Sequence, residues 1–289
     1  MSDAVKAVFE TGFFTDQPVH VALAVGTVVA VITAAVGVFT VMRGQSFAGE
    51  ALGDLGATGG SAAFLLDVGP LWGFTLMSLA GAAAMELIGI ERPRGRDLAT
   101  GIVLGAGLGL AALFLYLDTT YHNTTGATIT VLFGSLFAIS SSTIVPVAAL
   151  GAAALAIVLM LYRPLLLSTV NADMAAARGV PVRLVGAGYM LALALAVALA
   201  AMTIGAILST ALLIGPAATA LRLTARPGRA MLVAALIGIA AVWLGVLLAY
   251  DSYYWPPAQH GWPVSFFVVT LIFLSYVASG LVARRRGRS

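Results

Sequence analysis

Two carboxylates with a helical spacing stand out in an apolar part of this chain. Glu50 and Asp54 are four residues apart within the segment 47–66, and this spacing places both side chains on one face of a helix. A charge at such depth costs about 3 kcal/mol on insertion scales, so buried carboxylates usually pair, line a watery path or hold an ion. Two interpretations are open: a cation site facing a pathway, or carboxylates that are satisfied by neighbouring helices or protonated in place.

A glycine stripe runs beside the two carboxylates. Gly49, Gly53, Gly56 and Gly60 recur at spacings of four, three and four residues. Small residues with this periodicity let another helix approach closely inside a membrane. We therefore expect helix packing against the second apolar span at these glycines.

The elements that position these residues must be membrane helices. The chain has 289 residues, of which 61% are hydrophobic and only 9% are charged, and this leaves too little polar surface to cover a soluble globule. A window of about 20 residues predicts spans near residues 19–42, 47–66, 70–90, 98–118, 144–162, 184–203, 205–225, 229–249 and 264–283. If the weakly polar junction 203–205 does not interrupt the helix, the count falls to eight. Residues 126–139 are apolar but too short to cross, which favours a re-entrant or surface helix. The predicted fold is all-α: a polytopic membrane bundle of about eight to nine helices.

The basic residues predict the orientation of the bundle. Because short cytoplasmic loops retain Lys and Arg, we expect the N-terminus outside and the C-terminus in the cytoplasm. Residues 1–18 then form an outer segment, 19–283 the membrane domain and 284–289 a basic cytoplasmic tail. The same bias accounts for the basic pI, so no nucleic-acid partner is expected. Fourteen of the 15 basic residues fall in gaps on one side of the spans, and only Lys6 lies elsewhere; the fourteen are Arg43, Arg92, Arg94, Arg96, Arg163, Arg178, Arg183, Arg222, Arg226, Arg229, Arg284, Arg285, Arg286 and Arg288.

Several kinds of chemistry are excluded by missing residues. The chain has no cysteine, so it can form neither a disulfide nor a thiolate metal site. A Walker A loop needs a lysine after its glycines, and the single lysine, Lys6, lies in the predicted outer segment. Another chain must therefore hydrolyse any ATP. HExxH and GxSxG motifs are also absent, which argues against an intramembrane hydrolase.

Four segments together resemble a known family. They are RGQSFAGEALGD (43–54), LFGSLFAIS (132–140), NADMAAARGV (171–180) and GAILSTALLIGPAATA (205–220). In this order they resemble the permease subunits of bacterial ABC importers for manganese, zinc and iron, the ABC-3 type, over about residues 19–283. The resemblance implies a type II ABC importer permease-like fold in the bacterial plasma membrane and a divalent metal as substrate, with no permanently bound cofactor. It also implies as partners an ABC ATPase subunit that holds ATP, an extracytoplasmic solute-binding protein and a second copy of the chain.

One position departs from the family pattern. The family usually has an acidic residue followed four positions later by histidine, and here these positions hold Glu50 and Asp54. Two carboxylates are harder ligands than a carboxylate and an imidazole, which favours Mn²⁺ over Zn²⁺ or Fe²⁺. The departure also leaves open a chelated metal as substrate, or a gate that does not bind metal directly.

The cytoplasmic segment 164–183 is the expected contact with the ATPase. Residues 171–180 can form a short helix between two spans, and the resemblance implies that this helix couples the permease to the ATPase. Without the resemblance it would be an ordinary loop. The residues expected to carry the coupling are Asn171, Asp173, Arg178 and Gly179.

Three histidines are further candidates for metal contact, and two alternative functions remain open. His20, His122 and His260 fall near the predicted outer surface, where they could relay a metal or act as interfacial anchors. A permease for a metal chelate, siderophore or cobalamin would have a similar docking loop. A cation channel or secondary transporter could use the same two carboxylates, but it would need no ATPase.

Overall fold

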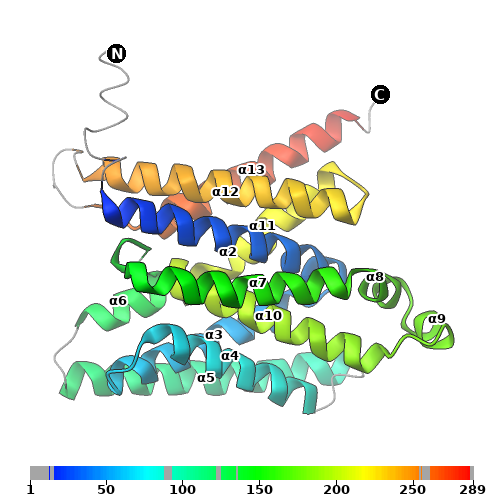
Figure 1. Ribbon diagram of the computed structural model, residues 1–289, viewed down its shortest axis with the longest axis horizontal. Coiled ribbons are helices and arrows are strands. Elements are labelled where there is room, and N and C mark those ends of the chain that lie inside the picture. The colour runs from blue at the N-terminus through cyan, green and yellow to red at the C-terminus, as the bar shows by residue number, and fades with distance from the viewer. Residues whose placement is uncertain are drawn as a thin grey trace.

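The computed structural model is a bundle of long helices, drawn in Figure 1. It describes residues 13, 16–87, 93–121, 125–134, 136–253, 255 and 261–286, and these contain helices but no strand. The predicted all-α bundle is confirmed. The long helices are α2 (Gln17–Met42), α3 (Ser46–Leu65), α4 (Pro70–Leu87), α5 (Pro93–Tyr121), α7 (Ile144–Met160), α10 (Val182–Ile204), α11 (Ala206–Leu223), α12 (Pro227–Ser252) and α13 (Val264–Arg286).

Each predicted span overlaps one of these long helices. Seven segments of the described residues are long and apolar enough to cross a membrane, and they lie in α2, α5, α7, α10, α11, α12 and α13. The other two helices, α3 and α4, have 20 and 18 residues and run beside α5 in the lower part of Figure 1. At 1.5 Å per residue, α3 is about 30 Å long, which matches the hydrocarbon core of a bilayer.

The structure shows how residues 126–139 fold and whether the junction 203–205 interrupts a helix. Residues 126–139 form α6 (Thr125–Phe133) and the 3₁₀ turn η1 (Leu136–Ala138); a nine-residue helix is too short to cross. A second 3₁₀ turn, η2 (Ser141–Thr143), leads into α7. The junction 203–205 does interrupt the helix, because Gly205 has φ 98° and ψ 152°, a conformation open mainly to glycine.

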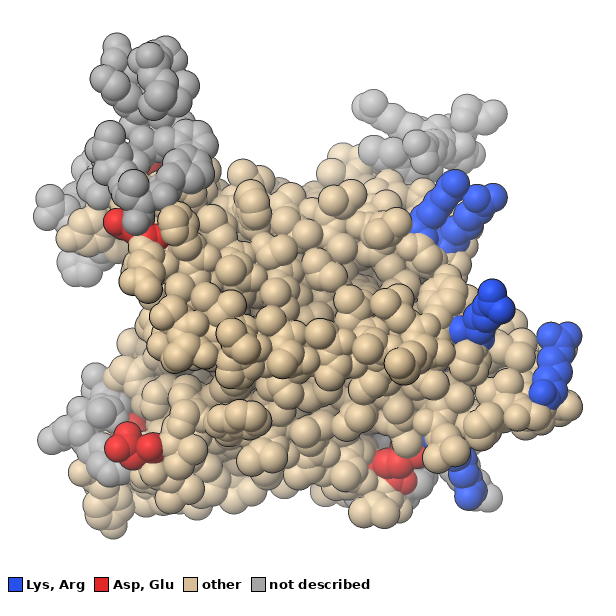
Figure 2. Space-filling view, in the orientation of Figure 1, with Lys and Arg blue, Asp and Glu red and all other residues tan. Residues whose placement is uncertain are grey.

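Arginines gather at one end of the bundle, which we call the arginine end. Figure 2 shows the blue side chains together on the right of the molecule. The short helices α8 (Tyr162–Val170) and α9 (Ala172–Ala177) lie at the same end in Figure 1. The exposed arginines of the described residues are Arg163, Arg178, Arg183, Arg222, Arg226 and Arg229.

The core of the bundle is built around α2 and α10. In both helices 72% of the most apolar window is buried, and from Ala192 to Ile204 every residue of α10 is buried. Alanines dominate this stretch, so neighbouring helices can approach closely. Against this core, α10 packs α3, α4, α7 and α11, and this packing fixes the position of the carboxylate helix α3.

Candidate metal pathway

A tight turn at the arginine end places the two carboxylates. Helix α2 ends at Met42, and the chain reverses at Gly44, where φ is 62°. The amide of Gln45 closes the turn on the carbonyl of Thr40 at 2.9 Å. Helix α3 then starts at Ser46, so Glu50 and Asp54 lie about 6 and 12 Å along the helix axis from its first residue.

The carboxylates lie on a side of α3 that the described residues leave uncovered. Glu50 is exposed and Asp54 is half-buried, whereas the residues between them are buried. Phe47, one turn before Glu50, is 42% exposed. We call Phe47, Glu50 and Asp54 the acidic strip. The strip ends one turn further along, where the buried Thr58 hydroxyl donates to the carbonyl of Gly107 on α5 at 2.6 Å.

The four glycines lie on other sides of α3, against neighbouring helices. A Cβ on Gly49 would lie 2.8 Å from the Leu213 side chain, and one on Gly53 would lie 3.0 Å from Ser209 Oγ; both neighbours belong to α11. The helix α4 approaches further along, where a Cβ on Gly56 would lie 2.8 Å from Ser78 Oγ and one on Gly60 would overlap the Phe74 ring. The glycines therefore hold α3 against α11 and α4 and leave the acidic strip unpacked.

A single chain offers only part of a metal site. In the described part of the chain, no ion pair or hydrogen bond to the carboxylate of Glu50 or Asp54 occurs, and no group of three or more His, Cys, Asp or Glu side chains comes together. Two carboxylates supply at most four oxygens, whereas Mn²⁺ and other hard cations are typically bound by about six. The remaining ligands must be water or groups from another molecule.

The predicted outer histidine His20 is not brought to the acidic strip. His20 is exposed in the first turn of α2, and 22 residues of helix separate it from Met42, which corresponds to about 33 Å. It therefore lies near the end opposite the acidic strip. His122 and His260 fall outside the described residues.

The predicted coupling segment forms the short helix α9. Asn171 caps its start, because its Oδ1 accepts from the amide of Met174 at 2.9 Å. Gly179, with φ 80°, ends it. Ala175 is fully buried and anchors the helix, while Met174 is 50% exposed. The four predicted coupling residues are all exposed at the arginine end: Asn171, Asp173, Arg178 and Gly179.

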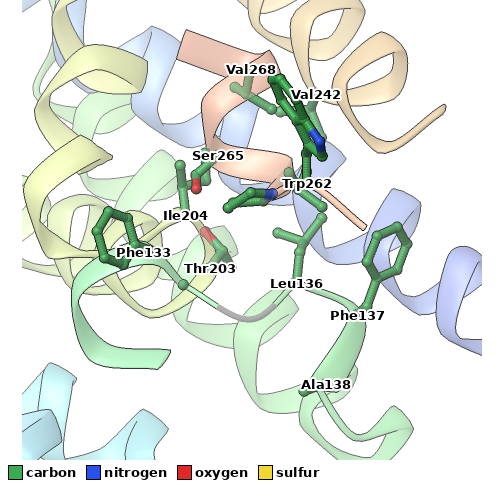
Figure 3. Close-up of a pocket in the computed structure, with 13 residues that line it drawn as sticks. Phe133, Leu136, Phe137, Ala138, Thr203, Ile204, Val242, Trp262, Ser265 and Val268 are labelled. Atoms are coloured by element: carbon green, nitrogen blue, oxygen red, sulfur yellow. The ribbon is translucent and has the colours of Figure 1, made fainter. Parts of the chain in front are cut away.

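A cavity of about 200 Å³ lies near the other end of the bundle and is drawn in Figure 3. Its wall is mostly apolar, from Phe133, Leu136, Val242 and Val268, with no carboxylate among its lining residues. Its two hydroxyl groups belong to Thr203, which donates to the Leu199 carbonyl at 2.9 Å, and to Ser265. This lining does not suit a cation, so the acidic strip is the better metal candidate.

Sequence reasoning missed one further carboxylate and one hydroxyl. Asp118 is 2% exposed near the end of α5. An acidic residue at the last position of the predicted span 98–118 was the pattern that could have indicated it. Thr58 follows Asp54 by four residues and closes the acidic strip. The four-residue spacing that links Glu50 and Asp54 also places Thr58 on the same face of the helix and could have indicated it.

The chain is similar to known transport proteins over most of its length. It is 30% identical to the manganese transport system membrane protein MntC of Halalkalibacterium halodurans, with 83% of each chain covered. It is 28% identical to the high-affinity zinc uptake system membrane protein ZnuB of Haemophilus influenzae, with 80% of this chain and 88% of the relative covered. Its fold is similar to that of PsaBC from Streptococcus pneumoniae, solved with a Fab, at a TM-score of 0.79, 24% identity and coverage of 96% and 95%. A model of the ABC 3 transport family matches residues 15–279, and the chain therefore belongs to that family.

Proposed function

We propose that this chain forms the pathway through which an ABC importer moves a divalent metal ion, preferentially Mn²⁺, into the cytoplasm. The chain is a transport subunit of its family, and ATP is hydrolysed by a separate subunit. The acidic strip carries the proposal. It is an exposed and half-exposed carboxylate pair on a membrane helix, without a partner among the described residues.

A second copy of the chain completes the site. An uncovered strip with two carboxylates is costly against lipid, but two such strips facing each other across a two-fold axis would enclose up to four carboxylates. That set of oxygens suits a hard cation. The tight packing of α3 on α11 and α4 then serves to present the acidic strip to the partner copy.

The choice of Mn²⁺ over Zn²⁺ rests on ligand chemistry. Asp54 stands where the resembling family usually has histidine, so the pair offers oxygen ligands only. Imidazole suits Zn²⁺, whereas carboxylates suit Mn²⁺ and other hard cations. Proteins named for manganese and for zinc transport are both among the relatives, so the ligand set is the argument that separates the two metals.

We infer the direction of transport, into the cytoplasm, from the family, and the orientation of the chain from the two ends of the bundle. Arginines favour the cytoplasmic side, so the arginine end faces the cytoplasm and the helix start at Gln17 faces outward. The exposed α9 at the arginine end then meets the ATPase, and a solute-binding protein delivers metal at the opposite end. The acidic strip lies one to two turns inside the cytoplasmic end of α3.

The test is uptake of radiolabelled Mn²⁺ by proteoliposomes that contain permease, ATPase and binding protein. We expect uptake that requires ATP hydrolysis and is lost in the double variant Glu50→Gln and Asp54→Asn. The matched control is Asp67→Asn, an exposed residue just after α3 with φ 54°, a conformation that Asn tolerates. The control should transport normally.

Three results would contradict the proposal. Normal uptake by the double variant would remove the acidic strip from the pathway. Uptake by the permease without the ATPase would indicate a channel or secondary transporter. Uptake of a metal chelate, but not of free Mn²⁺, would indicate a chelate permease.

A further inference from the structure

Arg43 connects the start of the carboxylate helix with the segment that leads to α9. It lies at the corner between α2 and α3, and its Nε donates to Gln45 Oε1 at 3.3 Å. Its Nη1 reaches across to α8 and donates to Ser168 Oγ at 3.2 Å and to Thr169 Oγ1 at 3.4 Å. One side chain therefore bonds to residues more than 120 positions apart in the sequence.

The hydroxyl groups on α8 are oriented to receive this cation. Ser168 and Thr169 both donate their own hydrogens to the carbonyl of Leu165, at 3.1 and 2.6 Å. Their lone pairs therefore remain for Arg43. Leu165 is fully buried and Ser168 is 8% exposed. Hydrogen bonds from a charged group are stronger than those between neutral groups.

A buried tyrosine also contacts the guanidinium of Arg43. The Arg43 guanidinium lies 5.2 Å from the centre of the Tyr189 ring on α10, a distance at which a cation is attracted to an aromatic face. Thr40 donates its hydroxyl hydrogen to the Val36 carbonyl at 3.0 Å. The Tyr189 hydroxyl therefore donates to Thr40 Oγ1, at 2.8 Å. Tyr189 is 1% exposed, so its ring is held in place by the surrounding core. Through Thr40, Arg43 and Tyr189, the end of α2 is therefore connected to α8 and α10.

Only short chain segments separate these hydrogen bonds of Arg43 from α9 and from the acidic strip. On one side, Thr169 is two residues before Asn171, the cap of α9. On the other side, Arg43 is three residues before the start of α3 and seven before Glu50. A displacement of α9 would thus reach the acidic strip through Arg43 without passing through a long loop.

We infer that Arg43 is a positioning residue that transmits movement of α8 and α9 to α3. ATP hydrolysis in an ATPase bound at α9 would then change the position of Glu50 and Asp54. The inference rests on the proposed function, because it needs an ATPase at α9. The ordinary alternative is that Arg43 only stabilises the fold.

The chain contains a matched control for that alternative. Arg222 also stacks on a tyrosine, with its guanidinium 3.7 Å from the Tyr276 ring, and it bonds to the backbone carbonyl of Tyr276 at 3.5 Å. Arg222 joins α11 to α13, and these contacts involve no residue of α8 or α9. Loss of this arginine removes similar stabilising contacts without touching the connection to α9.

The first experiment compares metal uptake with ATP hydrolysis in proteoliposomes. In Arg43→Gln we expect the number of metal ions taken up per ATP to fall by roughly tenfold or more, because the charged hydrogen bonds to Ser168 and Thr169 are lost, while ATP hydrolysis continues. Arg43→Lys, which keeps the charge, should recover part of the ratio. Arg222→Gln should keep the wild-type ratio. A proportional fall of uptake and hydrolysis in Arg43→Gln, with lowered thermal stability, would indicate a structural role only.

The second experiment measures the movement itself. The chain has no cysteine, so spin labels can be placed at Val170→Cys and Leu66→Cys, which are 81% and 70% exposed. Val170 is the last residue of α8, and Leu66 directly follows the end of α3 that is farthest from Arg43. We expect their distance to change when the ATPase binds ATP, and the change to be lost in Arg43→Gln. If this variant fails to fold, Ser168→Ala with Thr169→Val decides by the same two measurements.

The outcomes separate the inference from the proposed function. If wild-type permease shows no ATP-dependent uptake, the proposed function fails. If wild type transports but the label distance does not respond to ATP, or if the Arg43 and α8 variants retain both the uptake ratio and the response, the inference is wrong while the function stands.

Discussion

The backbones of Gly134 and Gly205 lie directly against each other. A Cβ on either residue would come within 2.6 Å of the amide nitrogen of the other. Both have positive φ, 77° for Gly134 and 98° for Gly205. Gly134 follows α6, and Gly205 separates α10 from α11. This contact therefore holds the short helix α6 against the break between α10 and α11, beside the cavity of Figure 3.

Replacing Gly205 with alanine should destabilise the protein strongly. Its φ is disfavoured for an L side chain, and such backbone strain alone costs about 1–3 kcal/mol; the new Cβ would also overlap Leu132 and Phe133. Thermal unfolding in detergent is the measurement, and a clearly lower midpoint is expected. Gly186→Ala is the control, because no neighbouring atom lies within 4 Å of its Cβ position. Equal midpoints for the two variants would contradict the packing at Gly205.

Hydropathy and charge were sufficient to predict the bundle, because each span of about 20 apolar residues must form all its backbone hydrogen bonds internally. They could not decide whether residues 203–205 interrupt a helix. That break contains almost no polar residue and depends on the positive φ of Gly205, which in turn depends on a neighbour 71 positions earlier.

The candidate site was only partly predictable for a similar reason. Helical spacing puts Glu50 and Asp54 on one face, but whether another helix covers that face depends on tertiary packing. The bonds from Arg43 to Ser168 and Thr169 leave no signal in local spacing. Arg43 looked like one more cytoplasmic arginine until the fold brought α8 to it.

Replacing Asp54 with histidine should shift the metal preference toward Zn²⁺. The change introduces an imidazole ligand, which binds Zn²⁺ well, into a site of oxygens. The measurement is competition between radiolabelled Mn²⁺ and Zn²⁺ for uptake in proteoliposomes. Asp54→Asn serves as the control, because it removes the charge without adding an imidazole. An unchanged Mn²⁺ to Zn²⁺ ratio in the histidine variant would argue against direct contact between residue 54 and the metal.

Metal binding should release protons and weaken as the pH falls. Carboxylates must be deprotonated to ligate a metal, so protons and Mn²⁺ compete for Glu50 and Asp54. Isothermal titration calorimetry of the purified permease in buffers of different ionisation enthalpy measures this release. The double variant Glu50→Gln and Asp54→Asn should show no release at this site. Proton release of equal size in both proteins would place the titrating groups elsewhere.

Reversing the charge of Arg178 should separate ATP hydrolysis from uptake. Arg178 is exposed at the end of α9, which the proposed function places against the ATPase, so a glutamate there should oppose that contact. Deletion of residues 171–180 should have the same effect more strongly. ATPase activity and Mn²⁺ uptake are measured on the same proteoliposomes. The control is Arg229→Glu, an exposed arginine in the first turn of α12. Full uptake by the α9 variants would remove the coupling assignment.

If two acidic strips face each other, a cysteine in the strip should crosslink to its copy. Phe47 is 42% exposed one turn before Glu50, and the natural chain has no cysteine to interfere. Oxidation of Phe47→Cys in membranes should therefore give a disulfide dimer, since a disulfide needs Cα atoms only about 4.4–6.8 Å apart, and short bifunctional reagents should capture wider spacings. Added Mn²⁺ should change the yield, because the metal would bridge carboxylates on both strips. Leu236→Cys is the control: it is 67% exposed on α12, which lies at the top of Figure 1, whereas α3 lies toward the bottom. Equal dimer yields from both positions would indicate random collision in the membrane. A dimer from position 236 alone would place the two-fold axis on another face and leave the acidic strip without the partner that its function requires.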